Sequence, residues 1–214
     1  MASTTAPAAA RTARAPRTLD PRVLVLAGGL SHERDVSLRS GRRVAETLRD
    51  TGLDVVVSDV DANIMPALEQ GAVDVVWPLL HGAQGEDGAI RDILELAQVP
   101  YVGSDPRACR MAWDKSVART VAVNAGLLVP DAVALPHSTF RELGAASVLK
   151  ALVHRLGLPL VVKPARGGSA LGVKVVRDAD ALPKAMVDCF AYGDVALIER
   201  FVEGTEVAVS VITT

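Results

Sequence analysis

The chain has 214 residues, of which 50% are hydrophobic and only 3% are aromatic, and its formal net charge is −2. The near balance of charge gives no support to a nucleic-acid partner, and a mean hydropathy of +0.28 excludes an intrinsically disordered chain. No apolar run approaches the ~18 residues of a membrane span. We therefore expect a soluble, cytoplasmic protein with no membrane partner, in which Cys109 and Cys189 are free thiols.

Residues 1–20 are rich in Ala, Thr, Pro and Arg, which favours a disordered tail over an organellar targeting segment. Short apolar runs then alternate with helix-like segments. Strands are predicted over 22–27, 53–58, 74–80 and 99–102, and helices over 36–51, 63–71 and 89–98, with a polar loop over 81–88. This alternation predicts a Rossmann-like parallel sheet, whose ligand crevice lies beyond the carboxyl ends of the strands.

The second half of the chain shows a different order of elements, with short strands joined by glycine turns and helices expected on one side of the sheet. Helices are predicted over 106–125, 138–156 and 178–190, and strands over 129–135, 160–164, 173–176, 195–201 and 206–212. This pattern predicts an α+β lid rather than a second Rossmann unit, with the boundary near residues 104–106. Because the chain stops directly after a hydrophobic strand, we expect it to be truncated.

Lys163 ends an apolar strand and is followed by the glycine-rich stretch 165–172. A lysine beside backbone N–H groups exposed by glycines suits a nucleotide triphosphate, although the lysine precedes the glycines and so does not form a Walker A loop. The alternative is an ordinary tight turn with a solvated lysine. Glu199 and Glu206 flank an apolar strand and hinge that could read an adenine and a ribose, or simply form a half-exposed strand with charged ends.

Two further candidates follow the predicted parallel strands. Glu33 lies after the Gly28-Gly29 turn, at the start of a helix. Its charge suits a substrate ammonium, and the alternative is that it only favours the helix N-terminus. His81 lies on a loop with three glycines, where it suits a ligand or acid–base role as well as a structural one.

The order of these segments resembles the D-alanine–D-alanine ligases of the ATP-grasp superfamily. The resemblance runs from about Arg22 to Thr214. Its motifs are Glu-Arg-Asp-Val-Ser at 33–37, His-Gly…Gly-Glu-Asp-Gly at 81–88, Asp-Lys at 114–115, Lys-Pro with the glycine-rich stretch at 163–172, and Glu…Gly…Glu at 199–206. The first two are specific for that family within the superfamily.

The resemblance implies roles for particular residues. Glu33 and Ser169 are implied as catalytic residues, Glu33 holding the ammonium of the first D-alanine. Val36 and His81 are implied beside the same substrate. The ATP-binding residues implied are Lys115, Lys163, Gly168, Ser169, Glu199, Arg200, Val202 and Glu206.

The resemblance also implies an organisation and a reaction. Residues 1–20 would be the tail, 21–105 the substrate-binding domain, 106–203 the ATP-grasp lid and 204–214 the start of a C-terminal domain. ATP and Mg²⁺ or Mn²⁺ would serve as cofactors, with the metal ligands beyond Thr214, and a homodimer is expected. The product would be D-alanyl-D-alanine for peptidoglycan. A D-lactate or D-serine ligase and a non-catalytic nucleotide-binding or dimerisation fragment remain the alternatives.

Overall fold

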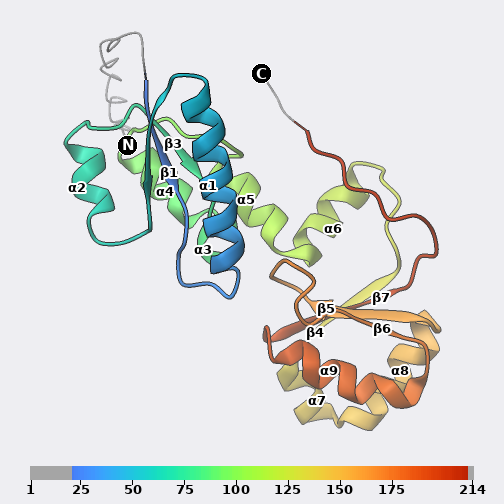
Figure 1. Cartoon of the computed structure of the whole chain (residues 1–214). Coiled ribbons are helices and arrows are strands. Elements are labelled where there is room, and N and C mark those ends of the chain that lie inside the picture. Colours follow the sequence, from blue (N-terminus) through green and yellow to red (C-terminus); the bar gives the residue numbers. More distant parts are fainter. Residues whose placement is uncertain (1–20, 212–214) are drawn as a thin grey trace, which may run out of the picture.

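The computed structural model of the chain describes residues 21–211, so the predicted tail over 1–20 lies outside the described residues. A first lobe, residues 22–101, surrounds a parallel sheet, and a second lobe, residues 132–200, surrounds an antiparallel sheet. Helices α5 (Pro106–Trp113) and α6 (Lys115–Asn124) lead from one lobe to the other (Figure 1). The predicted fold class, a Rossmann-like sheet followed by an α+β lid, is confirmed.

The sheet of the first lobe has the order β2-β1-β3. Its strands are β1 (Arg22–Leu26), β2 (Asp54–Ser58) and β3 (Val75–Pro78), all parallel. The central strand β1 is buried on both faces, since four of its five residues are inaccessible. Full burial of a central parallel strand explains the continuous apolar run that the sequence shows there.

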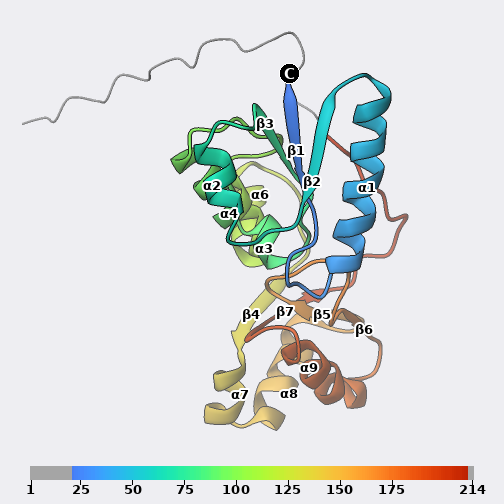
Figure 2. The same ribbon diagram turned by 60° about the vertical axis from the view of Figure 1, so that its left-hand side comes forward.

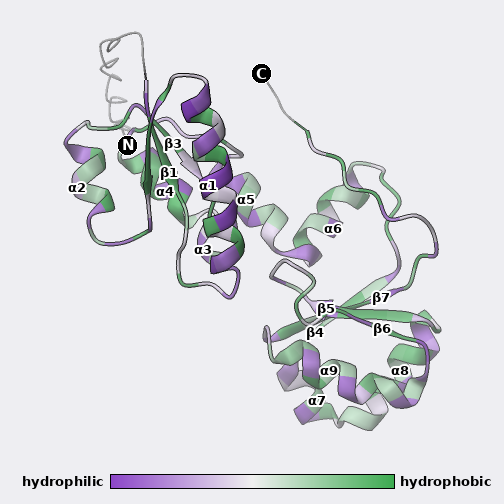
Figure 3. Cartoon of the chain, viewed as in Figure 1, coloured by the Kyte–Doolittle hydropathy of each residue, from purple (hydrophilic) through white to green (hydrophobic). Residues whose placement is uncertain are grey.

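Helices cover both faces of this sheet. They are α1 (Arg34–Asp50), α2 (Ile64–Glu69), α3 (Ala83–Glu86) and α4 (Ala89–Leu96). Val25 packs with Ala45 of α1 on one face, whereas Leu26 packs with Leu68 of α2 and Leu94 of α4 on the other. Figure 3 shows the strands coloured as hydrophobic, while α1 carries alternating hydrophilic and hydrophobic colour along its length. This amphipathic pattern is what a helix covering one sheet face requires.

Two expectations for the first lobe are wrong. The loop predicted over 81–88 contains the short helix α3. The strand predicted over 99–102 is reduced to a single parallel bridge between Val76 and Tyr101, because Gly103, at a φ of +116°, turns the backbone away from the sheet directly afterwards. The three strands still leave their carboxyl ends at one edge of the lobe.

The sheet of the second lobe has the order β4-β7-β5-β6, with antiparallel neighbours throughout. Its strands are β4 (Ala132–Pro136), β5 (Leu160–Pro164), β6 (Lys174–Val176) and β7 (Val195–Arg200). Its helices are α7 (His137–Leu143), α8 (Ala145–Leu156) and α9 (Leu182–Phe190), with a 3₁₀ turn at Ala179–Ala181. Figures 1 and 2 show α7, α8 and α9 on the face of the sheet that points away from the first lobe.

Three further expectations are corrected in this half. The helix predicted over 106–125 breaks at Asp114, which has extended dihedrals and caps α6. The helix predicted over 138–156 breaks at Gly144, at a φ of +83°. The strand predicted over 206–212 is absent from its described residues, 206–211, which are exposed coil. A strand needs a hydrogen-bonded neighbour, and none of the described residues pairs with this segment.

Cys109 and Cys189 are both buried free thiols, as predicted. Among residues 21–211, no helix combines the length and the apolar character needed to cross a membrane.

Candidate functional site

Ser37 fixes the turn after β1 at the edge of the first sheet. Its hydroxyl accepts a hydrogen bond from the Gly28 N–H at 2.8 Å and donates to the Leu79 carbonyl at 2.6 Å. Ser37 is fully buried. This single side chain therefore ties the ends of β1 and β3 to the first turn of α1, and it places residues 31–33 over the crevice.

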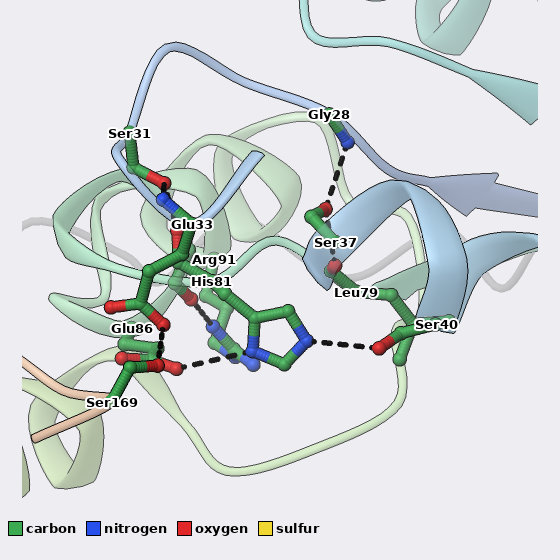
Figure 4. Close-up of polar contacts among 11 residues, drawn as sticks. Gly28, Ser31, Glu33, Ser37, Ser40, Leu79, His81, Glu86, Arg91 and Ser169 are labelled. Atoms are coloured by element: carbon green, nitrogen blue, oxygen red, sulfur yellow. Dashed lines mark hydrogen bonds and ion pairs between the residues drawn. The ribbon is translucent and has the colours of Figure 1, made fainter. Parts of the chain in front are cut away.

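Glu33 lies in that crevice and reaches the second lobe. It occupies the N-cap position of α1, but its side chain makes no capping hydrogen bond. Its Oε2 atom instead accepts a hydrogen bond from the Ser169 hydroxyl at 2.5 Å (Figure 4). The residue is only 8% exposed. No capping hydrogen bond therefore supports the alternative that Glu33 only stabilises the helix N-terminus. The carboxylate instead points at the glycine-rich turn, residues 165–172.

His81 lies beside Glu33, between two polar partners. Its Nε2 atom is 3.2 Å from the Ser40 hydroxyl, and its Nδ1 atom is 3.5 Å from Glu86 Oε1 (Figure 4). Ser40 lies on α1 one turn beyond Ser37. A ring held on both nitrogens has a fixed orientation, which suits a group that borders a substrate.

The glycine-rich turn approaches both carboxylates of this crevice. A Cβ at Gly168 would lie 3.3 Å from Glu33 Oε1 and 3.5 Å from Glu86 Oε2. Glycine at this position thus allows the backbone to lie against two acidic side chains. The next two residues, Ser169 and Ala170, have φ values of +48° and +57°, a left-handed conformation that costs energy for residues with a Cβ.

Lys115 holds the start of the same turn. Its ammonium donates to the Gly167 carbonyl at 2.7 Å, and its backbone N–H donates to the Ala165 carbonyl at 2.8 Å. Burial, and then the neighbouring Lys163 ammonium, lower the pKa of Lys115. Two lysine ammoniums that repel one another beside a turn form a site that an anion would stabilise.

Lys163 lies on the face of the second sheet that α8 and α9 leave open. Leu160 and Val162 of β5 belong to the core under the helices, so strand alternation places Lys163 on the opposite face. Glu199 of β7 shares that face and lies diagonally across the register from Lys163. The Lys163 ammonium is 2.5 Å from Glu199 Oε1, and the two side chains are 22% and 14% exposed.

Asp114 joins the linker helices to the glycine-rich turn. It forms an ion pair with Arg166 at 3.0 Å and accepts from the Ser116 N–H at 3.0 Å. Burial opposes its ionisation, but the hydrogen bonds from Arg166 and from the start of α6 outweigh burial and lower the pKa of Asp114. Asp114 therefore stays ionised and positions Lys115, its neighbour in the chain.

A cavity of about 510 Å³ lies between the lobes on one side of the turn. Residues of both lobes and of the linker helices line it, among them Glu33, Gly82, Trp113, Arg166, Gly168 and Tyr192. Lys115, Lys163 and Ser169 are not among its lining residues. The turn thus separates a cavity bordered by Glu33 from the sheet face that carries Lys163.

A family model described as D-ala D-ala ligase N-terminus matches residues 60–104, and one described as D-ala D-ala ligase C-terminus matches residues 121–214. A D-alanine–D-alanine ligase of Anaeromyxobacter sp. (strain K) is 41% identical over 191 residues, which are 89% of this chain and 60% of that protein. The chain belongs to the D-alanine–D-alanine ligase family.

Solved structures of D-alanine–D-alanine ligases agree with this assignment. The crystal structure of the Bacillus anthracis enzyme aligns with a TM-score of 0.73 at 30% identity, covering 86% of this chain and 58% of that one. A second structure from the same organism, complexed with ATP, gives a TM-score of 0.70 at 28% identity, covering 86% and 60%. The chain spans about 60% of the length of the curated relatives it matches.

The four remaining residues that the resemblance to D-alanine–D-alanine ligases implies lie in three different settings. Val36 lies in the first turn of α1 and is 38% exposed. The Arg200 guanidinium donates to the Leu156 carbonyl at 3.2 Å, at the end of α8. Val202 and Glu206 lie in exposed coil after β7. None of these four is held beside the Lys163–Glu199 pair by a hydrogen bond or ion pair of the described residues.

Several residues of this site escaped the sequence analysis. Ser40 was missed, although its helical spacing from Ser37 places both on the face of α1 that meets the strand ends. Arg166 and Tyr192 were missed because their partners, Asp114 and Gly172, are distant in the sequence. Among residues 21–211, no three His, Cys, Asp or Glu side chains gather as a metal site requires.

Proposed function

We propose that the chain takes part in the ATP-dependent ligation of two D-alanine molecules to D-alanyl-D-alanine, for peptidoglycan synthesis. The observation that carries the proposal is the Ser169–Glu33 hydrogen bond. It joins a carboxylate suited to an ammonium to a turn flanked by Lys115 and Lys163. An amino acid and a nucleotide triphosphate would thereby meet at one turn.

The first D-alanine would bind on the first lobe. Glu33 is buried and ionisable, and a substrate ammonium would supply the counter-charge that a desolvated carboxylate needs. His81, fixed by Ser40 and Glu86, would border the same molecule, and Val36 would contact it from the first turn of α1. Ser169 would orient the Glu33 carboxylate.

ATP would bind to the second lobe. Lys115 and Lys163 would hold its phosphates, and the backbone N–H groups at Gly168 and Ser169 would add donors. This agrees with the lowered pKa of Lys115, since an anion would relieve the repulsion between the two ammoniums. A structural relative is described as complexed with ATP.

The adenine and ribose would lie further along β7 and the segment after it. Glu199 shares the open sheet face with the apolar residues Val161 and Leu197, which suits a flat base. Arg200 and Val202 would offer backbone groups to the adenine edge, and Glu206 would accept from the ribose hydroxyls.

The reaction would proceed in two steps. A carboxylate oxygen of the first D-alanine attacks the γ-phosphorus of ATP, so that an acyl phosphate forms and ADP leaves. The amine of the second D-alanine then attacks the acyl carbon, forming the peptide bond and releasing phosphate with a proton. In both steps these residues would act by positioning and by electrostatic stabilisation.

Mg²⁺ or Mn²⁺ belongs to the proposal as the ion that neutralises phosphate charge. The described residues do not form a site for it, so we derive no step through the metal from them. We further propose the domains 21–105, 106–203 and 204–214, a homodimer and a cytoplasmic location.

Phosphate release tests the proposal on the protein produced from its complete reading frame. D-alanine alone should stimulate phosphate release from ATP, and mass spectrometry should identify the dipeptide. Added D-lactate or D-serine should not yield a mixed product. ATP hydrolysis that is indifferent to D-alanine, or a mixed product in preference to the dipeptide, would contradict it.

A further inference from the structure

The glycine-rich turn is held in a conformation that its own backbone does not favour. Ser169 and Ala170 are consecutive left-handed residues with side chains, and each such residue costs energy. The turn would relax unless neighbouring groups hold it. Lys115 holds its start through the Gly167 carbonyl, and Glu33 holds its middle through Ser169.

Tyr192 lies against the end of the turn. A Cβ at Gly172 would lie 2.9 Å from Tyr192 Cδ2 and 3.0 Å from Pro164 Cγ. Gly172 also has a φ of +71°. Glycine at this position therefore allows the tyrosine ring and Pro164, the residue that precedes the turn, to pack closely against the turn's last residue.

Tyr192 is itself anchored to the core of the second lobe. Its backbone N–H donates to the Cys189 carbonyl at 3.0 Å, and Cys189 is fully buried in that core. A Cβ at the following residue, Gly193, would lie 3.6 Å from Pro164 Cβ. The core of the second lobe thus fixes the segment after α9 in place, and this segment packs against both ends of the turn.

The tyrosine ring also reaches the first lobe. Its centroid is 6.5 Å from that of His32, with an interplanar angle of 78°, an edge-to-face arrangement. His32 precedes Glu33, and both rings line the cavity between the lobes. Tyr192 therefore connects the turn to the loop that carries Glu33, the side chain proposed to bind the ammonium of D-alanine.

We propose that Tyr192 is a positioning residue: its packing holds the glycine-rich turn in the conformation in which Ser169 reaches Glu33. We call this packing the clamp. The significance of this clamp for substrate binding rests on the proposed function, whereas the clamp itself does not. The clamp consists of packing contacts made by the aromatic ring of Tyr192.

Hydrogen exchange of the chain tests the clamp without any substrate. Tyr192→Ala should speed amide exchange over residues 167–172 about threefold to tenfold, which corresponds to the loss of an aromatic contact. Tyr192→Phe keeps the ring and should exchange like the wild type. Val187→Ala, on an exposed position of α9, is the matched control and should change nothing in the turn.

Exchange in β7, inside the sheet of the second lobe, separates a clamp from a general loss of stability of that lobe. It should be equal in all variants. A second variant, His32→Ala, changes only the first lobe and should also speed exchange in the turn. Unchanged exchange in Tyr192→Ala, equal acceleration in β7, or failure of Tyr192→Phe to restore the wild-type rate would each overturn the proposal. A failed ligase assay would overturn only the proposed function.

Discussion

Ser169 donates its hydroxyl proton to Glu33 over 2.5 Å, although the two residues are 136 positions apart in the chain. Glu33 follows the first parallel strand, and Ser169 belongs to a turn of the antiparallel lobe. The bond is therefore formed between lobes, and it brings the side chain suited to an ammonium to the turn suited to phosphates.

The charge of Glu33 should affect the binding of D-alanine strongly and the stability of the fold only slightly. Glu33→Gln keeps shape and hydrogen-bonding capacity but leaves the D-alanine ammonium without its counter-charge, at a cost of about 2–5 kcal/mol. The KM for D-alanine should rise steeply while the melting temperature barely moves, because this side chain makes no helix-capping bond. Steady-state kinetics and a thermal melt on the same variant check this. Normal kinetics with lowered stability would remove Glu33 from the site.

Two substitutions of Ser169 should separate its hydroxyl from its backbone conformation. Ser169→Ala removes a bond to a charged acceptor, at a cost of about 1.5–3 kcal/mol. Ser169→Gly loses the same bond but relieves the left-handed backbone, so it should be more stable than Ser169→Ala by about 0.5–1 kcal/mol. Urea unfolding of the chain measures both. Equal stabilities would mean that the positive φ of Ser169 carries no strain.

Nucleotide affinity should depend on one strand lysine and not on another. Lys163→Ala should weaken binding of a fluorescent ATP analogue by about 1.5–3 kcal/mol, since a charge-assisted contact is lost. Lys174→Ala is the matched control, because Lys174 is exposed on β6. Titrations of both variants of the protein from the complete reading frame give the comparison. Equal affinities would rule out a phosphate role for Lys163.

The lowered pKa of Lys115 predicts a pH dependence of stability. Burial and Lys163 disfavour its charged form in the folded state, so the unfolded chain binds more protons, and the free energy of unfolding should rise with pH. The rise should span the window from the lowered pKa up to about 10.4, the usual value for lysine.

Lys115→Met isolates this effect, because the other titrating groups are shared. Lys115→Met also loses the bond to the Gly167 carbonyl, a loss that is expressed at every pH, so the test is the trend: the free energy of unfolding of the wild type should rise relative to that of the variant as the pH approaches the usual lysine value. Denaturant unfolding at several pH values measures it. A difference that does not change with pH would show that Lys115 titrates normally.

Local sequence determined much of this protein. The apolar runs of β1 and β3 are long enough to predict a buried parallel sheet, because burial on both faces leaves no position for a polar residue. Glu33 and His81 could be placed at the sheet edge, because they directly follow those strands. Lys163 and the glycine-rich turn could be recognised together, because the residues that form them are adjacent in the chain.

Tertiary structure decided the rest. The strand predicted over 99–102 and the one over 206–212 depend on a neighbouring strand, which a local pattern does not reveal. Asp114 interrupts a helix that propensity alone would continue, because its carboxylate caps α6 and pairs with Arg166. The Ser169–Glu33 and Tyr192–His32 contacts exist only because two lobes with separate cores meet at one turn, and the positions that meet are set by packing across the whole chain.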